Sequence, residues 1–174
     1  MSYSLFELLA PNFQQTIAAA KGVLEKSAAW AAENGVDAAD LAQARLREDM
    51  QPLGFQVHSI THHSLNALKG VEAGAFSPPS GAMPETLPAM SAALDDTLKQ
   101  LGEWDAARIN ALAAKDMKFK LGDREIPFVG FDFLMSFSLP NFYFHATTAY
   151  DILRHKGVPL SKRDYLGQLR IKQP

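Results

Sequence analysis

The stretch from Leu139 to Leu160 constrains the fold most, because it combines a helix, a helix stop and a polar pair on one helical face. Asn141 and His145 are four residues apart and therefore share a face of a helix. Gly157 and Pro159 follow, and a glycine cap before a proline that cannot continue the helix is typical of a helix C-terminus. The pattern predicts a helix whose apolar face carries an imidazole.

Three further segments repeat apolar residues with the period of a helix. The first begins at Ser4, which fits a capping box with Glu7, and ends at Asn34–Gly35; Pro11 predicts a kink or a short leading turn. The others span about Pro52–Glu72 and Leu87–Leu112, and a short connecting helix is expected over Asp37–Arg47. The last long helix spans about Gly130–His155 with a bend at Pro140.

The connections between these helices complete the expected architecture. Residues 74–88 are rich in proline and glycine, which predicts a loop. Residues 118–128 alternate in polarity around Gly122–Asp123, which favours a β-hairpin. We therefore predict an all-α protein, a four-helix bundle with a small β-hairpin insertion before the last long helix, in a single domain over residues 1–174.

Composition excludes several classes of function. The chain has no cysteine, so a disulfide framework, a thiolate metal site and a cysteine nucleophile are excluded. At 174 residues it can bury a core without a structural metal. Neither a signal peptide nor a membrane span is apparent, so we expect a cytoplasmic protein without a membrane partner. The C-terminal segment is basic but lacks a nucleic-acid motif, and nucleic-acid binding is not expected.

The histidines of the second long helix fall on two sides of it. At about 100° per residue, Gln56 and His63 lie beside the apolar stripe, whereas His58 and His62 fall on the opposite face. His58 and His62 have metal-ligand spacing, but no third ligand accompanies them. We interpret them as an incidental, solvent-exposed pair.

On the last helix, His145 is the main candidate for a functional side chain. It shares an otherwise apolar face with the polar residues Asn141 and Thr148, and buried polar groups need partners. One interpretation is a structural hydrogen-bond network with Asn141, Gln56 or Tyr150. The other is a ligand or general base at the bottom of a pocket between helices.

Three stretches of the chain resemble a known family. Residues 50–57, 139–150 and 157–167 are similar to the uncharacterised DUF1993 family, within the DinB/YfiT-like superfamily. From His145 onward the sequence resembles the last helix of that superfamily, where a ligand histidine precedes Leu-Arg-x-x-Gly-x-Pro. The resemblance implies a four-helix bundle, often a homodimer. In several members it also implies a three-histidine divalent-metal site for thiol transfer or isomerisation.

The chain departs from that metal-site pattern. His145 matches the last ligand, but Asn141 and Gln56 occupy the other two positions. Amide oxygens are weak neutral ligands, so affinity for Zn or Ni should fall sharply. His63 is a candidate substitute ligand if the second helix rotates. No cofactor is assured, and a divalent metal would be weakly bound.

Three functions follow, in order of preference. The first is a small-molecule-binding bundle with a degenerate metal site, where Gln56, Asn141, His145, Thr148 and Tyr150 contact an unidentified small molecule without metal. The second is a divalent-metal-dependent enzyme of the thiol-transferase or isomerase type, which uses a cation to activate a nucleophile. The third is a non-enzymatic, oligomeric stress or scaffold protein.

Overall fold

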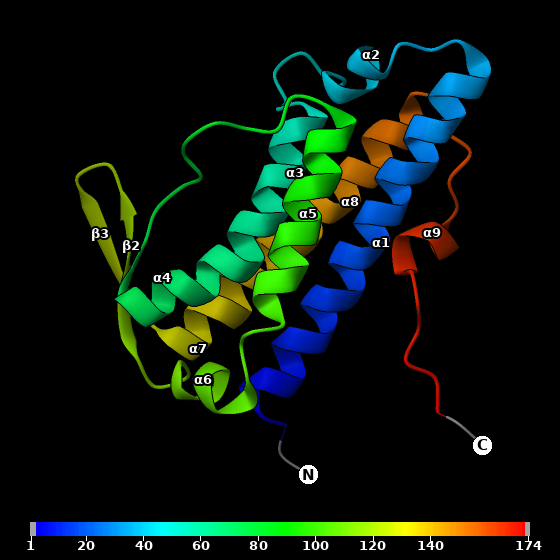
Figure 1. The fold of residues 1–174 in the computed structure, drawn as a ribbon. Helices are drawn as coiled ribbons and strands as arrows, with labels where there is room; N and C mark the ends of the chain where they lie inside the picture. The colour runs from blue at the N-terminus through cyan, green and yellow to red at the C-terminus, as the bar shows by residue number, and fades with distance from the viewer. Residues whose placement is uncertain (1–2, 173–174) are drawn as a thin grey trace.

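The computed structural model describes residues 3–172, which are mostly helical with a small sheet at one end (Figure 1). The helices are α1 (Leu5–Asn34), α2 (Ala38–Ala42), α3 (Leu53–Thr61), α4 (Ala67–Ala73), α5 (Leu87–Leu101), α6 (Ala106–Ala111), α7 (Gly130–Asp132), α8 (Leu139–His155) and α9 (Lys162–Leu166). Two π-helical turns, η1 (His62–Asn66) and η2 (Phe133–Ser138), continue the helical path from α3 to α4 and from α7 to α8. The strands are β1 (Ala75–Phe76), β2 (Asp116–Leu121) and β3 (Arg124–Val129).

Helix α1 begins and ends where the sequence predicts. The Ser4 side chain accepts a hydrogen bond from the Glu7 backbone N–H, and the Glu7 carboxylate accepts one from the Ser4 backbone, which completes the capping box. Gly35 ends the helix with a φ of 65°, a left-handed conformation that glycine adopts without strain. Of the two alternatives predicted at Pro11, a kink or a separate leading turn, the separate turn is wrong, because α1 continues through that residue.

Two other predicted helices are shorter than the sequence suggests. The segment predicted over residues 87–112 divides into α5 and α6, because Gly102 ends the first helix and Asp105 caps the second by accepting from the Arg108 N–H at 2.8 Å. The helix predicted over residues 37–47 is limited to α2. Beyond it, the Arg45 guanidinium donates to the carbonyls of Glu48 and Met50 and so supports a turn.

The sheet has one strand more than the sequence predicts. Strands β2 and β3 pair antiparallel, with Phe119 opposite Ile126 and Gly122 in the turn at a φ of 58°. Strand β1 pairs in parallel with β2, with Ala75 opposite Lys118. A two-residue strand leaves no periodic signal, so this part of residues 74–88 was predicted as loop. The pairing holds the chain after α4 against the side of that helix.

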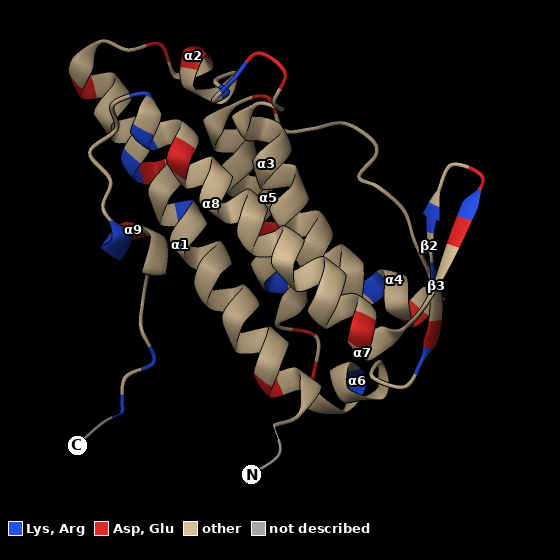
Figure 2. Cartoon of the chain, turned by 180° about the vertical axis from the view of Figure 1, so that it is seen from behind, with Lys and Arg blue, Asp and Glu red and all other residues tan. Residues whose placement is uncertain are grey.

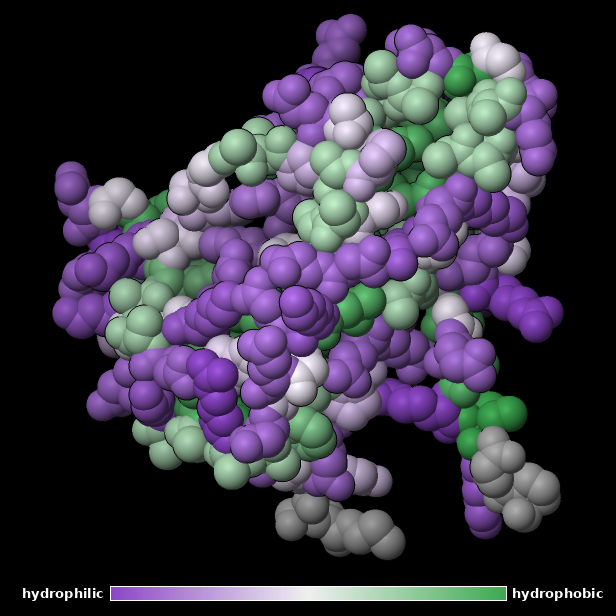
Figure 3. All heavy atoms as spheres, viewed as in Figure 1, coloured by the Kyte–Doolittle hydropathy of each residue, from purple (hydrophilic) through white to green (hydrophobic). Residues whose placement is uncertain are grey.

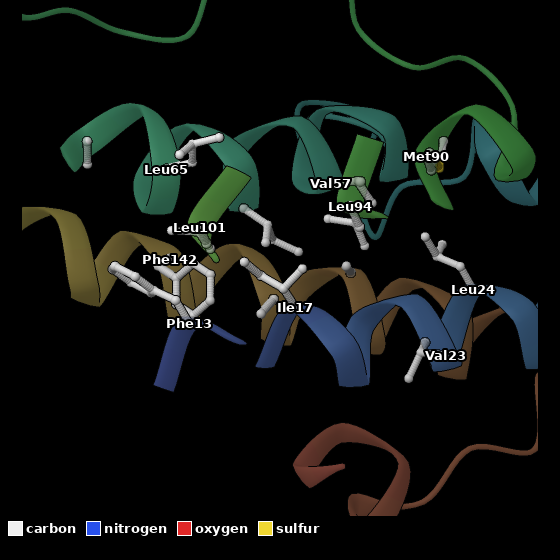
Figure 4. Close-up of a cluster of buried hydrophobic side chains, with 14 of the residues drawn as sticks. Phe13, Ile17, Val23, Leu24, Val57, Leu65, Met90, Leu94, Leu101 and Phe142 are labelled. Carbon is white, nitrogen blue, oxygen red and sulfur yellow. The ribbon is translucent and has the colours of Figure 1, made fainter. Parts of the chain in front are cut away.

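The long helices share one hydrophobic core. Helix α1 packs against α5 and α8, and α3 packs against the same two helices from the other side (Figure 1). Figure 4 shows the buried side chains between them, where Phe13 of α1 meets Phe142 of α8 edge to face, with ring centroids 4.8 Å apart. This packing brings α3 and α8 side by side along their length.

Charged side chains concentrate at the periphery of the molecule. Figure 2 shows them at the helix ends, on the β2–β3 turn and along the C-terminal segment, whereas much of the long helices is uncharged. Hydrophilic residues cover much of the face in Figure 3, with apolar residues gathered toward the end near α2. Within residues 3–172, no helix has the length and apolar character that crossing a bilayer requires.

Gly130, where β3 meets α7, gives a stability prediction. A methyl group there would collide with the Leu112 carbonyl oxygen and approach Val71 Cγ1 at 2.7 Å. Because a backbone carbonyl cannot rotate away, we expect Gly130→Ala to lower the free energy of unfolding by about 3 kcal/mol. Urea denaturation measures the change.

Gly22 provides the matched control for this substitution. It lies inside α1, and a Cβ added there would meet nothing within 4 Å. Gly22→Ala should therefore raise the free energy of unfolding by roughly 0.5–1 kcal/mol, through helix propensity alone. Equal effects of the two substitutions would contradict the packing described at Gly130.

Candidate functional site

A hydrogen bond between Gln56 and His145 joins α3 to α8. His145 Nδ1 lies 2.8 Å from Gln56 Oε1, and Gln56 Nε2 donates to the Gln51 carbonyl at 3.0 Å. Because the amide nitrogen is committed to Gln51, the amide oxygen faces the imidazole and must accept. His145 therefore carries its proton on Nδ1, and Nε2 keeps a lone pair.

The ring of His63 stacks on that of His145. The two rings are nearly parallel, at 11°, with centroids 5.6 Å apart. His63 is 5% exposed, and its Nδ1 is buried without a hydrogen-bond partner in the described part of the chain. Phe137 packs edge-on at 5.8 Å. A buried polar atom without a partner marks a functional candidate rather than an ordinary core contact.

The π-helical turn η1 supports this placement of His63. A π turn displaces backbone carbonyls from the regular helical ladder, and such turns occur often at functional sites. The Ser138 hydroxyl, at the end of η2, donates to the His63 carbonyl at 2.9 Å. The two π turns therefore meet through a buried hydrogen bond beside the imidazole pair.

The prediction that His58 and His62 form a solvent-exposed pair is wrong for His62, which is 9% exposed. Its Nε2 donates to the Ser77 carbonyl at 2.8 Å, and its ring lies 4.3 Å from that of Phe76. Strand β1 brings Phe76 back over this face of the helix, a long-range contact that helical spacing does not show. His58 is half-buried and lies parallel to His62.

The structure thus aligns four of the five histidines in what we call the histidine row. Successive ring centroids from His58 to His62, His63 and His145 are 6.4, 5.2 and 5.6 Å apart. The sequence signal for the row was the consecutive pair at positions 62 and 63, but only the fold shows that both side chains are buried.

Burial keeps the histidine row neutral. Loss of hydration, together with the neighbouring imidazoles of His62 and His145, lowers the pKa of His63 to about 3. Burial and His62 lower the pKa of His145 to about 4. Burial also lowers the pKa values of His58 and His62. Neutral imidazoles accept hydrogen bonds, act as bases and ligate metals.

The other predicted contact residues do not converge on His145. The Asn141 amide donates to the Phe137 carbonyl at 2.7 Å, and the Thr148 hydroxyl donates to the Phe144 carbonyl at 2.8 Å. Both bonds reach back four residues along the helix, a local alternative that such side chains often take. Tyr150 lines a different, mostly apolar cavity between α1, α8 and α9.

Two aromatic side chains that were not among the predicted contact residues flank His145 instead. Phe55 and Phe144 both pack edge-on to its ring, at 5.8 and 5.3 Å between centroids. Phe55 precedes Gln56 and Phe144 precedes His145, so neither shares the helical face on which the prediction concentrated. Phe144 is 59% exposed, which places the imidazole near the surface rather than deep in the core.

The donor set does not fit the three-histidine metal centre that the superfamily resemblance implies. Two of the three positions hold amides, Gln56 and Asn141, and the Gln56 oxygen is engaged with His145 Nδ1. Across residues 3–172, no group of three or more His, Cys, Asp or Glu side chains is arranged to hold a metal ion. What the arrangement offers is a neutral imidazole of fixed tautomer beside aromatic rings.

The lowered pKa values predict acid sensitivity. An unfolded histidine titrates near pH 6.5, whereas folded His63 titrates at about 3, so the unfolded state binds more protons between these values. The contribution to stability is complete above the unfolded pKa and declines as the pH falls. We expect His63 alone to remove about 2 kcal/mol of unfolding free energy between pH 7 and pH 5.

Urea denaturation over this pH range measures that loss. His63→Leu removes the titrating group and should flatten the pH dependence. His155→Ala, at an exposed position, should leave it unchanged. An unaltered slope in His63→Leu would show that His63 is not the source.

Comparison with known proteins places this site in context. The chain is similar to a DinB family member from Shewanella denitrificans, known from a crystal structure, with 28% sequence identity and a TM-score of 0.83. That match covers 98% of this chain and 96% of the other. Comparison with functionally curated proteins finds no match. A model of the DUF1993 family, a domain of unknown function, matches residues 5–166, and the chain therefore belongs to that family.

Proposed function

We propose that this protein binds an uncharged small molecule between α3 and α8 of a DinB-type four-helix bundle, without a metal. The observation that carries the proposal is the Gln56–His145 hydrogen bond, which fixes the tautomer and leaves His145 Nε2 as an acceptor. A ligand that donates a hydroxyl or N–H group would satisfy that nitrogen.

The surroundings of His145 favour an uncharged, partly aromatic ligand. Residues 139–150 of α8 contain no Lys, Arg, Asp or Glu. Phe55 and Phe144 flank the imidazole with their rings. Ligand sites are usually lined by such apolar and aromatic groups around a few fixed polar atoms.

His63 strengthens this preference for a neutral ligand. Because its ring lies parallel to that of His145, protonation of either imidazole would place a positive charge against its neighbour. The pKa of His145, lowered to about 4, keeps the site neutral at physiological pH. An anion would therefore gain little from it. From the family resemblance and the composition, we also expect a homodimer in the cytoplasm.

Phenol and anisole test this proposal as a pair, since they share a ring but only phenol donates a hydrogen bond. We expect phenol to shift the ¹⁵N resonances of His145 in a saturable titration, and anisole to bind about tenfold more weakly. His145→Ala should abolish the difference between the two compounds, whereas His155→Ala should preserve it.

Two results would contradict the proposal. One is equal binding of phenol and anisole, or binding that His145→Ala does not alter. The other is a stoichiometric metal in untagged protein that is lost in His145→Ala. That second result would replace the metal-free site with the divalent-metal enzyme of thiol-transferase or isomerase type.

A further inference from the structure

We propose that His58 and His62 form a second site, separate from the one at His145, that chelates a late divalent transition metal such as Ni²⁺ or Cu²⁺. The two histidines lie four residues apart near the end of α3. They line a hollow of about 260 Å³ beneath residues 75–80. His145 does not line this hollow.

The helix brings these two side chains together. Helical side chains lean toward the N-terminus, so the His62 ring lies over the turn that carries His58. Their rings are nearly parallel, at 10°, with centroids 6.4 Å apart. His58 is only half-buried, so a rotation of its side chain can close the remaining distance to a shared ion.

Contacts within the protein fix the tautomer and the ring orientation of His62 as they are commonly fixed in a ligating histidine. Its Nε2 must carry the proton, because a carbonyl oxygen, that of Ser77, can only accept. The lone pair is therefore on Nδ1. A ligating histidine commonly donates its other nitrogen to a carbonyl or carboxylate, which fixes ring orientation and tautomer. Packing of the ring on Phe76 adds to this restraint.

The chemistry of the hollow selects the class of metal. Imidazole nitrogens suit Cu²⁺, Ni²⁺ and Zn²⁺, whereas Mg²⁺ and Ca²⁺ prefer oxygen ligands. Asn66, one turn beyond His62, lines the same hollow and offers an amide oxygen. Water can complete the coordination shell because the hollow is open.

Calorimetric titration of untagged protein with Ni²⁺ tests the site. We expect one ion per chain, and a loss of about 100-fold in affinity in His58→Ala, because one imidazole remains where two acted together. His145→Ala and His155→Ala serve as matched controls and should bind Ni²⁺ as the wild type does. Should His58→Ala fail to fold, His58→Leu makes the same comparison, because leucine fills a similar space and cannot ligate a metal.

Cu²⁺ electron paramagnetic resonance provides an independent measurement. The nitrogen hyperfine pattern should report two imidazoles in the wild type and one in His58→Ala. The proposal is overturned if the wild type binds no Ni²⁺, or if His58→Ala retains full affinity. It is also overturned if His145→Ala, rather than His58→Ala, removes binding, since the ion would then lie at the other site.

Discussion

The π-helical turn η1 is the constraint on which the candidate site depends. It lies where the path from α3 to α4 carries His62 and His63, and both of these consecutive side chains are buried. Neighbours on a helix diverge by about 100°, so the two rings face different parts of the fold: His63 stacks on His145 of α8, whereas His62 packs on Phe76 of β1. The carbonyl of His63 is satisfied from η2 by Ser138, so each π turn helps to support the other.

From this constraint the electrostatics of the site follow. The alignment of four imidazoles across two helices removes them from water. Burying an imidazole costs less free energy when the ring is neutral than when it is protonated. The Gln56–His145 bond then decides which nitrogen of His145 remains available. Elsewhere in the row, the Ser77–His62 bond likewise determines which nitrogen of His62 keeps its lone pair. The amide oxygen of Gln56 thus leaves a lone pair on His145 Nε2, and the backbone oxygen of Ser77 leaves one on His62 Nδ1.

Local sequence signals predicted the elements more successfully than the contacts between them. The capping box at Ser4, the stop at Gly35 and the alternation around Gly122 all correspond to features of the structure, because each depends on neighbouring residues. The face of His62 was wrongly assigned because its cover comes from β1, which pairs with a strand some forty residues further along the chain. Helical periodicity carries no information about such a pairing.

In the candidate site, too, the sequence predicted some residues correctly but not most of the contacts between them. The sequence singled out Gln56 and His145, and the structure brings these two side chains into direct contact. Asn141 and Thr148 share the helical face of His145, but their side chains bond to their own helix, which spacing alone does not reveal. His63 was expected beside the apolar stripe, and the structure places it in η1 with its ring stacked on that of His145, a contact that helical spacing alone does not show.

The tautomer of His145 is the most direct test of this account, and side-chain ¹⁵N NMR at neutral pH measures it. The Gln56 hydrogen bond predicts a neutral ring with the proton on Nδ1 and an unprotonated Nε2. An imidazolium, or a ring protonated on Nε2 alone, would contradict the account, because the acceptor proposed to bind the ligand would then be absent.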